Sequence, residues 1–287
     1  MEDQCVFVCE RGYESDIKYK ILRKEDMSIL NKIKENDVLF CKTDFIHLLA
    51  YCIDVVKHPF YLVSGRSDYT IPEYFSHQSM LLLNSDKVKK WYAVNCVSPH
   101  EKLVPIPLGI SYHDQYELKQ ILPIDQEREL VTVKSEFISI EQTGMKAVTN
   151  FQHAMNDPPP RKMFRTAAYK ALQNNDCVIW LPKQDRLDFW KSCNENLFVI
   201  CPFGNGPDTH RVYEVLALGR VPIVFICYLN KLLFEDLPVV IVSNWKQINA
   251  EFLENQKRII VEKYNKNEYK FEKMTSAYWR NIIMQSQ

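Results

Sequence analysis

The segment from Phe198 to Phe225 contains the residue types that bind a diphosphate group. An apolar run typical of a buried strand ends at Cys201, and a loop rich in glycine and proline leads into a helix that begins near Thr209. Glycine lets the backbone approach a ligand closely. The first turn of a helix offers unpaired N–H groups and the positive end of the helix dipole. Arg211 falls in that turn, where its guanidinium group can pair with phosphate oxygens.

Glu214 follows Arg211 by three residues, so the two side chains share one face of the helix. A carboxylate there can accept two hydroxyls of a ribose. Spacing alone favours a plainer interpretation, a capped helix that carries a surface ion pair. The G-x-G at 204–206 lacks the third glycine of the dinucleotide fingerprint. The sequence contains no GxxxxGK[ST], which excludes a P-loop.

Short apolar runs alternate with helix-like stretches on both sides of this segment. We expect strands at 37–41, 59–64, 80–83, 87–95, 102–108, 145–151, 177–181, 197–201, 221–225 and 239–242. We expect helices at 43–56, from 71, at 161–173 (after the prolines at 158–160), 187–193, 209–218, 245–265 and 269–284. This alternation is typical of βα units and parallel sheets.

The chain has 287 residues, about two domains' worth at ~150 residues each. Residues 112–141 are charged and fit no period, so we place a linker and the domain boundary there. The sequence therefore predicts an α/β fold with two Rossmann-like domains that face a cleft, and ligands at the carboxyl ends of the strands. The predicted domains are 1–140 and 141–268, and a last helix at 269–287 returns to the first domain.

The composition, 46% hydrophobic and 25% charged residues, is typical of a globular protein. Lys plus Arg equals Asp plus Glu at 36, which argues against a nucleic-acid partner. The nine cysteines are odd in number and irregularly spaced, which favours buried free thiols over disulfides or a zinc site. The polar N-terminus is unlike a signal peptide, and no apolar run approaches ~18 residues. We therefore expect no membrane anchor and a cytoplasmic protein.

The string GPDTHRVYEVLALGRVPIV resembles the C-terminal signature of the exostosin glycosyltransferases, glycosyltransferase family 47. In that signature Arg is followed three residues later by Glu, and small residues lead into G-x-x-P-[VI]-[VI]. The matching residues here are Arg211, Glu214, Gly219, Pro222, Ile223 and Val224. Further similarity lies in LFEDLP at 233–238, Trp245, the YW at 278–279, and Asn150-Phe151 followed by Arg161. The match is good over 145–285 and weak over 1–140, and the chain is similar to the stand-alone exostosin-like enzymes of large algal viruses.

The resemblance implies a GT-B fold with the donor in the C-terminal domain and the acceptor on the N-terminal domain. It also implies an inverting glycosyltransferase. The expected donor is a nucleotide-sugar, in this family usually a UDP-sugar, with UDP-xylose as one example. The expected acceptor is a glycan hydroxyl of an oligosaccharide or glycoprotein. The nucleotide-sugar is a substrate, and we expect no cofactor.

An inverting transfer needs a base for the acceptor hydroxyl and positive groups for the leaving diphosphate. Arg211 and the start of its helix suit the diphosphate, and Glu214 suits the ribose. Lys183, after the strand at 177–181, can reach a phosphate or the nucleobase, although a solvated loop lysine is an equal interpretation. The full set of predicted donor-binding residues is Gly206, Asp208, Thr209, His210, Arg211, Glu214 and Lys183.

The base should follow a strand of the N-terminal domain and face the cleft. Asp68, after the strand at 59–64, is our first choice, although it also suits a helix cap or turn. Asp44 is the second choice, and the neighbouring His113 and Asp114 are the third. Arg66 can bind the acceptor or a phosphate. No D-x-D motif is present, so we expect activity without a metal ion.

Other classes of function compete with this one. A module that binds a nucleotide-sugar or a glycan without catalysis would keep the donor loop and lack the base. A dehydrogenase is disfavoured by the missing GxGxxG motif. A scaffold protein is mildly disfavoured, because a glycine-rich helix start such as GNGPDTHR has no evident use in packing.

Overall fold

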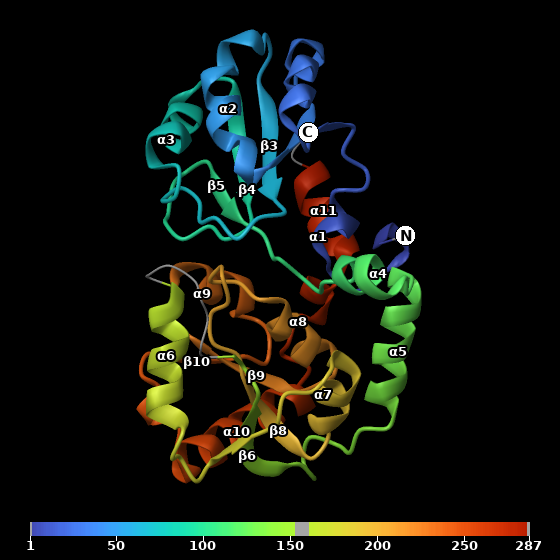
Figure 1. Ribbon diagram of the computed structural model, residues 1–287, viewed down its shortest axis with the longest axis vertical. Coiled ribbons are helices and arrows are strands. Elements are labelled where there is room, and N and C mark those ends of the chain that lie inside the picture. Colours follow the sequence, from blue (N-terminus) through green and yellow to red (C-terminus); the bar gives the residue numbers. More distant parts are fainter. Residues whose placement is uncertain (1, 153–160, 286–287) are drawn as a thin grey trace.

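The computed structural model describes residues 2–152 and 161–285. The prolines at 158–160, which we expected to precede a helix, lie outside these residues. The fold contains two separate parallel sheets of five strands each, one above the other in Figure 1. This confirms the predicted α/β class with two Rossmann-like domains.

The first sheet has the strand order β1-β2-β3-β4-β5. Its strands are β1 (Tyr19–Ile21), β2 (Val38–Lys42), β3 (Phe60–Gly65), β4 (Val88–Ala93) and β5 (Leu103–Pro105). Helices α2 (Ile46–Tyr51) and α3 (Ser76–Asn84) pack against each other beside it (Figure 1). Leu39, Phe40, Leu62 and Trp91 are fully buried, as expected of parallel strands covered on both faces.

The second sheet has the order β10-β9-β8-β6-β7. Its strands are β6 (Gly144–Thr149), β7 (Val178–Trp180), β8 (Asn196–Ile200), β9 (Val221–Phe225) and β10 (Val240–Val242). Its helices are α6 (Arg161–Leu172), α7 (Arg186–Ser192), α8 (His210–Ala217), α9 (Tyr228–Phe234) and α10 (Ala250–Asn265). Gly219 follows α8 in the left-handed conformation (φ +72°) that favours glycine after a helix.

Short 3₁₀ helices occupy several connections. They are η1 (Glu2–Gln4), η2 (Lys24–Lys32), η3 (Thr43–Phe45), η4 (Ile53–Val55), η5 (Trp245–Gln247) and η6 (Phe271–Met274). The helix predicted at 43–56 is therefore broken into η3, α2 and η4. The helix expected from 71 begins only at Ser76.

Two sequence predictions are wrong, and two elements were missed. Residues 80–83 are not a strand but the middle of α3, because a short apolar run suits a buried helix face as well as a strand. Residues 112–141 are not an irregular linker, because they contain α4 (His113–Lys119) and α5 (Pro123–Ser135). Strand β1 and helix α9 were missed, β1 because its three residues lie in a polar context.

The last helix, α11 (Ser276–Met284), packs against the short N-terminal helix α1 (Glu10–Tyr13). Val8 N–H donates to the Met274 carbonyl (2.7 Å) and Ser276 N–H to that of Val6 (3.0 Å). Both helices lie beside the first sheet in Figure 1. The domain boundaries at 140 and 268 stay predictions.

The nine cysteines form no disulfide, and six of them are buried. Within residues 2–152 and 161–285, the helices are all too short or too polar to cross a membrane.

The two halves of the protein meet at Asp208, whose side chain is buried. Its Oδ2 accepts the N–H of Leu108 (2.8 Å), after β5, and the hydroxyl of Tyr213 (2.7 Å), in α8. Its Oδ1 accepts the N–H of Thr209 (2.9 Å). The Asp208 N–H in turn donates to Oδ1 of Asn95 (3.1 Å), after β4. Burial raises the pKa of the Asp208 carboxyl to about 6, because desolvation penalises its charge.

We predict that Asp208→Ala destabilises the protein strongly, because two buried donors and one partly buried donor lose their acceptor. Each unsatisfied donor costs about 1–3 kcal/mol, so we expect the free energy of unfolding to fall by about 3 kcal/mol or more. Chemical denaturation followed by tryptophan fluorescence measures this. Asp86→Ala is the control, because the Asp86 side chain is 85% exposed. A loss of less than about 1 kcal/mol would contradict the structural role of Asp208.

Candidate functional site

The first of three adjoining cavities lies at the carboxyl ends of β6, β7 and β8. Its volume is about 680 Å³. Phe151, Tyr169 and Trp180 form an aromatic group in its lining, with ring centroids 5.1 Å apart for Phe151 and Trp180 and 5.3 Å for Tyr169 and Trp180. The lining also includes the amide side chains of Asn150, Gln152 and Gln184. Flat aromatic surfaces beside amide groups suit a nucleobase, which stacks and hydrogen-bonds at its edge.

The second cavity, of about 440 Å³, lies between the two halves. The first half contributes Asp68, Ser111 and Asp114, and the second half contributes Arg186 and Glu214, among others. Four residues line both the first and second cavities: Arg165, Gln184, Thr209 and Arg211. The passage between these cavities is therefore bordered by two guanidinium groups.

The third cavity, of about 590 Å³, opens on the first half. Its charged lining comes from Glu10, Arg11, Lys42, Arg66, Asp68 and Asp114. Four residues line both the second and third cavities: Asp68, Leu108, Asp114 and His210. The three cavities thus adjoin in series. We call the residues shared by the first and second cavities the first junction, and those shared by the second and third cavities the second junction. The first junction contains two guanidinium groups, and the second contains two carboxylates and an imidazole.

Arg211 and Glu214, predicted to hold the donor, lie together as expected from their spacing. Arg211 Nη1 donates to Oδ1 of Asn150 (2.8 Å), and the guanidinium lies 3.6 Å above the Phe189 ring. Glu214 lies between two arginines, 2.9 Å from Nε of Arg186 and 3.7 Å from Nε of Arg211. It lines the second cavity and is buried. The carboxylate thus orients two guanidinium groups toward the space where an anion would bind.

Thr209 occupies the N-cap position of α8 without capping it through its side chain. Its Oγ1 is buried and makes no hydrogen bond among the described residues. Because Thr209 lines both the first and second cavities, this hydroxyl is an unused polar group at the junction.

Gly206 packs against the first half of the protein. A Cβ atom there would lie 2.6 Å from Nδ2 of Asn95, too close for any real contact. A larger residue at 206 would therefore force the Asn95 side chain to move, and Gly206 also lines the second cavity. Both carboxylate oxygens of Asp208 accept hydrogen bonds from protein groups, so its donor-binding role stays a prediction.

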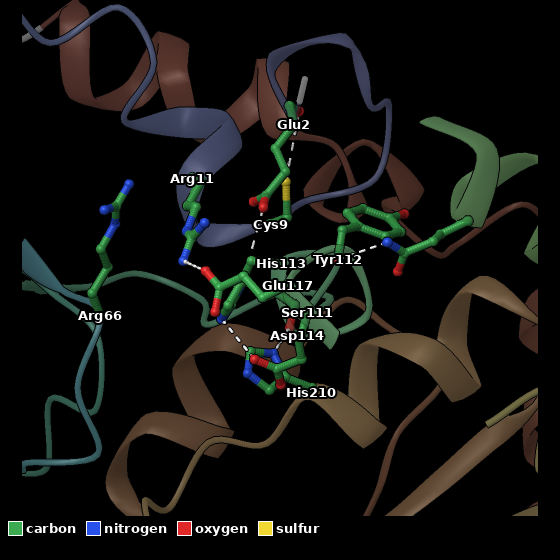
Figure 2. A network of polar contacts seen from close by, with 12 residues as sticks. Glu2, Cys9, Arg11, Arg66, Ser111, Tyr112, His113, Asp114, Glu117 and His210 are labelled. Atoms are coloured by element: carbon green, nitrogen blue, oxygen red, sulfur yellow. Dashed lines mark hydrogen bonds and ion pairs between the residues drawn. The ribbon is translucent and has the colours of Figure 1, made fainter. Parts of the chain in front are cut away.

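His210 lies at the second junction. Its Nδ1 is 2.6 Å from the Gly109 carbonyl, and a carbonyl can only accept, so Nδ1 carries the proton. Burial lowers the pKa of His210, since desolvation penalises the imidazolium ion. The neutral ring then has an unprotonated Nε2. Figure 2 shows His210 directly beside Asp114 and near His113, whose ring centroid lies 6.1 Å away.

Asp68, our first choice for the base, is exposed and lines both the second and third cavities. Arg66, two residues earlier, lines the third cavity. Its backbone is left-handed (φ 55°), which is uncommon outside glycine, and its guanidinium pairs with the buried Glu14. Lys183 is exposed and lines the first cavity. The catalytic and binding roles of these three residues stay predictions.

The alternative bases lie in different places. Asp44 pairs with Lys42 (3.6 Å) and is not among the lining residues of the three cavities. Asp114 lies at the second junction, with Oδ1 3.3 Å from Nε2 of His113. Burial lowers the pKa of His113 to about 4, so this imidazole is neutral at physiological pH.

Sequence reasoning missed Arg186, Arg165 and Asn95. Arg186 opens α7 after β7, and besides Glu214 it contacts the Ser111 carbonyl (2.8 Å) and Gln126 Oε1 (3.1 Å). Its position soon after the end of a strand could have marked Arg186 as a candidate site residue. Arg165 lies within α6, where its Nε donates to the Phe203 carbonyl (2.8 Å), and nothing in the sequence marks it. Asn95 follows β4 with φ 54°, a position that Asn tolerates well.

No cluster of three or more His, Cys, Asp or Glu side chains that could bind a metal is present in residues 2–152 and 161–285. Metal independence stays a prediction.

The chain matches no known family model and no curated protein sequence. The chain is similar to several solved structures at low identity and low TM-score. One is "Trehalose-6-phosphate from E. coli bound with UDP-2-fluoro glucose" (11% identity, 92% of this chain, 73% of that chain, TM-score 0.40). Another is an alpha,alpha-trehalose-phosphate synthase (UDP-forming) from Burkholderia vietnamiensis (10% identity, 99% of this chain, 79% of that chain, TM-score 0.41). A third is the GtfA/B complex (10% identity, 90% of this chain, 59% of that chain, TM-score 0.42). At these values the likeness says nothing about activity, which has to be inferred from the cavities and their residues.

Proposed function

We propose that this protein is a glycosyltransferase that moves a sugar from a nucleotide-sugar to a glycan hydroxyl. The observation that carries the proposal is the order of the three cavities and of the charges between them. A nucleotide-sugar has a base at one end, a diphosphate in the middle and a sugar at the other end. The cavities offer an aromatic lining, then two arginines, then a polar space between the two halves.

The diphosphate fits the first junction. Arg165 and Arg211 border it, and Thr209, at the N-cap of α8, lies beside it. Guanidinium groups bind phosphate oxygens through paired hydrogen bonds. The unused hydroxyl of Thr209 supplies a further donor. The nucleoside then occupies the first cavity, where Lys183 can also reach it, and the sugar occupies the second.

The reaction is a single displacement at the second junction, where the donor sugar meets an acceptor in the third cavity. Asp68 accepts the proton of the acceptor hydroxyl, and the oxygen attacks the anomeric carbon. The bond from that carbon to the diphosphate oxygen breaks, and the nucleoside diphosphate leaves with the electron pair. The arginines of the first junction stabilise its negative charge. This attack from the face opposite the leaving group inverts the anomeric carbon, as the exostosin resemblance implies.

The resemblance also supports a UDP-sugar as the donor, of which UDP-xylose is one example, and an oligosaccharide or glycoprotein as the acceptor. The scheme uses protein cations where other transferases use a metal ion. We place the reaction in the cytoplasm, in keeping with the nine free cysteines.

The first experiment is a thermal-shift and calorimetry panel with EDTA throughout. It contains UDP, GDP, UDP-xylose, UDP-glucose, UDP-glucuronate, UDP-galactose and GDP-fucose. We expect one nucleotide class to stabilise the protein without metal. Failure of all seven to bind would refute the proposal. Nucleotide binding without transfer to any acceptor would instead favour a non-catalytic nucleotide-sugar-binding module.

We predict that Glu214→Ala weakens the binding of UDP by about 1.5–3 kcal/mol, roughly 10- to 100-fold, if the ribose reaches across the first junction to Glu214, which lines the second cavity. Calorimetry with inorganic pyrophosphate is the control, because it has no ribose and should bind the variant as well as the native protein. A parallel loss for pyrophosphate would show that Glu214 acts by orienting Arg186 and Arg211 instead.

We predict that Asp68→Asn lowers turnover by a factor of about 100 or more, because the amide cannot take the acceptor proton. Affinity for the nucleotide donor should not change, since the first cavity is untouched. Asp86→Asn, on an exposed loop away from the cavities, is the matched control. Full activity in Asp68→Asn would assign the base to another residue of the second junction, of which Asp114 is the other carboxylate.

A further inference from the structure

The third cavity contains a buried carboxyl group that the proposed reaction does not use. Glu10, the first residue of α1, lines this cavity beside Arg66 and Asp68, yet it is only 4% exposed. A carboxyl group this well buried needs hydrogen-bond partners for both of its oxygens.

One oxygen of Glu10 has such a partner within the protein. Oε1 accepts the backbone N–H of Arg66, the residue whose backbone is left-handed. A Cβ atom on the preceding Gly65 would collide with the same oxygen, so glycine is needed there for the close approach. Glu10 therefore fixes the exit of β3, the loop that carries both Arg66 and Asp68.

The other oxygen is available to a ligand. Among residues 2–152 and 161–285, Oε2 of Glu10 has no hydrogen-bond partner, and it is not sealed from the cavity in the way that Oε2 of Glu14 is. Because Oε1 accepts an N–H, a proton on this carboxyl group resides on Oε2, on the side open to a ligand.

We propose that Glu10 is an acceptor-binding residue, whose Oε2 donates a hydrogen bond to a hydroxyl oxygen of a sugar held in the third cavity. This rests on the proposed function, since it assumes that the third cavity receives the acceptor. A carboxylic acid that donates leaves Asp68 as the group that accepts the proton of the reacting hydroxyl. The two carboxyl groups then contact the acceptor in different ways.

The surroundings of Glu10 support its protonated form. Burial raises the pKa of Glu10 to about 8, the Arg66 N–H lowers it, and the charge of Glu14 raises it. The guanidinium groups of Arg66 and Arg11 lower it less. Figure 2 shows Arg11 and Arg66 on the same side of the polar network, with Arg11 directed to Glu117 at 3.0 Å. The rest of the charged and titratable lining of the cavity is Lys42, Asp68, His113, Asp114 and His210.

The test uses protein saturated with UDP and titrated with methyl β-glucoside, methyl β-galactoside and methyl β-xyloside, followed by NMR. Glu10→Ala should weaken binding of the best glycoside about 5- to 10-fold, the usual effect of losing one hydrogen bond. Glu10→Gln should bind it within about twofold of the native protein at neutral pH, because its amide donates from the same place. UDP affinity should be equal in all variants.

The pH profile separates ligand contact from a purely structural role. In the native protein, affinity for the glycoside should fall as the pH rises through about 8, because Glu10 then loses the proton it donates. Glu10→Gln should abolish this fall. Glu14→Gln is the comparison variant, because Glu14 is also buried and pairs with Arg66 but does not line the cavity. It should keep the fall in affinity but shift it to lower pH, because the charge of Glu14 raises the pKa of Glu10.

Three results would overturn the inference. One is native affinity in Glu10→Ala, another is the native pH profile in Glu10→Gln, and the third is that no methyl glycoside binds the UDP-saturated protein. Failure of UDP itself to bind would instead count against the proposed function, so the two hypotheses fail in different measurements.

Discussion

The hydrogen bonds of Asp208 are the constraint on which the rest of the site depends. A buried carboxylate that accepts N–H groups from both halves fixes the start of α8 relative to the segment after β5. The contacts of His210 with Gly109 and of Arg186 with Ser111 extend this connection in the same region. If it were absent, the second cavity, lined from both halves, would have no defined shape. Burial of the carboxylate is unfavourable by itself, and it is tolerated because each oxygen is hydrogen-bonded.

The charges of the site are arranged so that an anion is needed to complete them. Glu214 is shared by Arg186 and Arg211, so one carboxylate neutralises only one of two guanidinium groups. Arg211 is further held by Asn150 and by the face of Phe189, which leaves it little freedom to turn away. A rigid cation loses less entropy when it binds a ligand than a flexible one. Under the proposed function, these contacts hold the first junction ready for a phosphate group before the donor binds.

The sequence predicts the sheets well, because parallel strands buried on both faces leave continuous apolar runs such as VLFC at 38–41. It fails where local pattern is ambiguous: MLLL at 80–83 suits a strand or a helix, and only packing against α2 decides. Helix α4 was missed because it has no buried residues, and α5 because its few buried positions, such as Leu130 and Val133, lie among charged residues. Of the site, the loop at 204–209 and the first turn of α8 were predictable, because glycines precede a clear helix start. Glu10, Asn95 and Arg165 were not, because their proximity to the cavities arises from the arrangement of distant segments.

The short stretch from Asp208 to Arg211 divides its side chains between two tasks. Asp208 and His210 hydrogen-bond groups of the first half, at Leu108 and Gly109, while Thr209 and Arg211 line the first cavity. Alternate residues thus contact opposite sides because the chain passes there from extended backbone into the first turn of α8. Contact between the halves and binding at the first junction therefore depend on the same few backbone dihedral angles. A substitution that alters the contact between the halves must therefore also alter binding at the first junction. A loss of donor affinity caused by a substitution in this stretch is informative only when the stability of the same variant is measured.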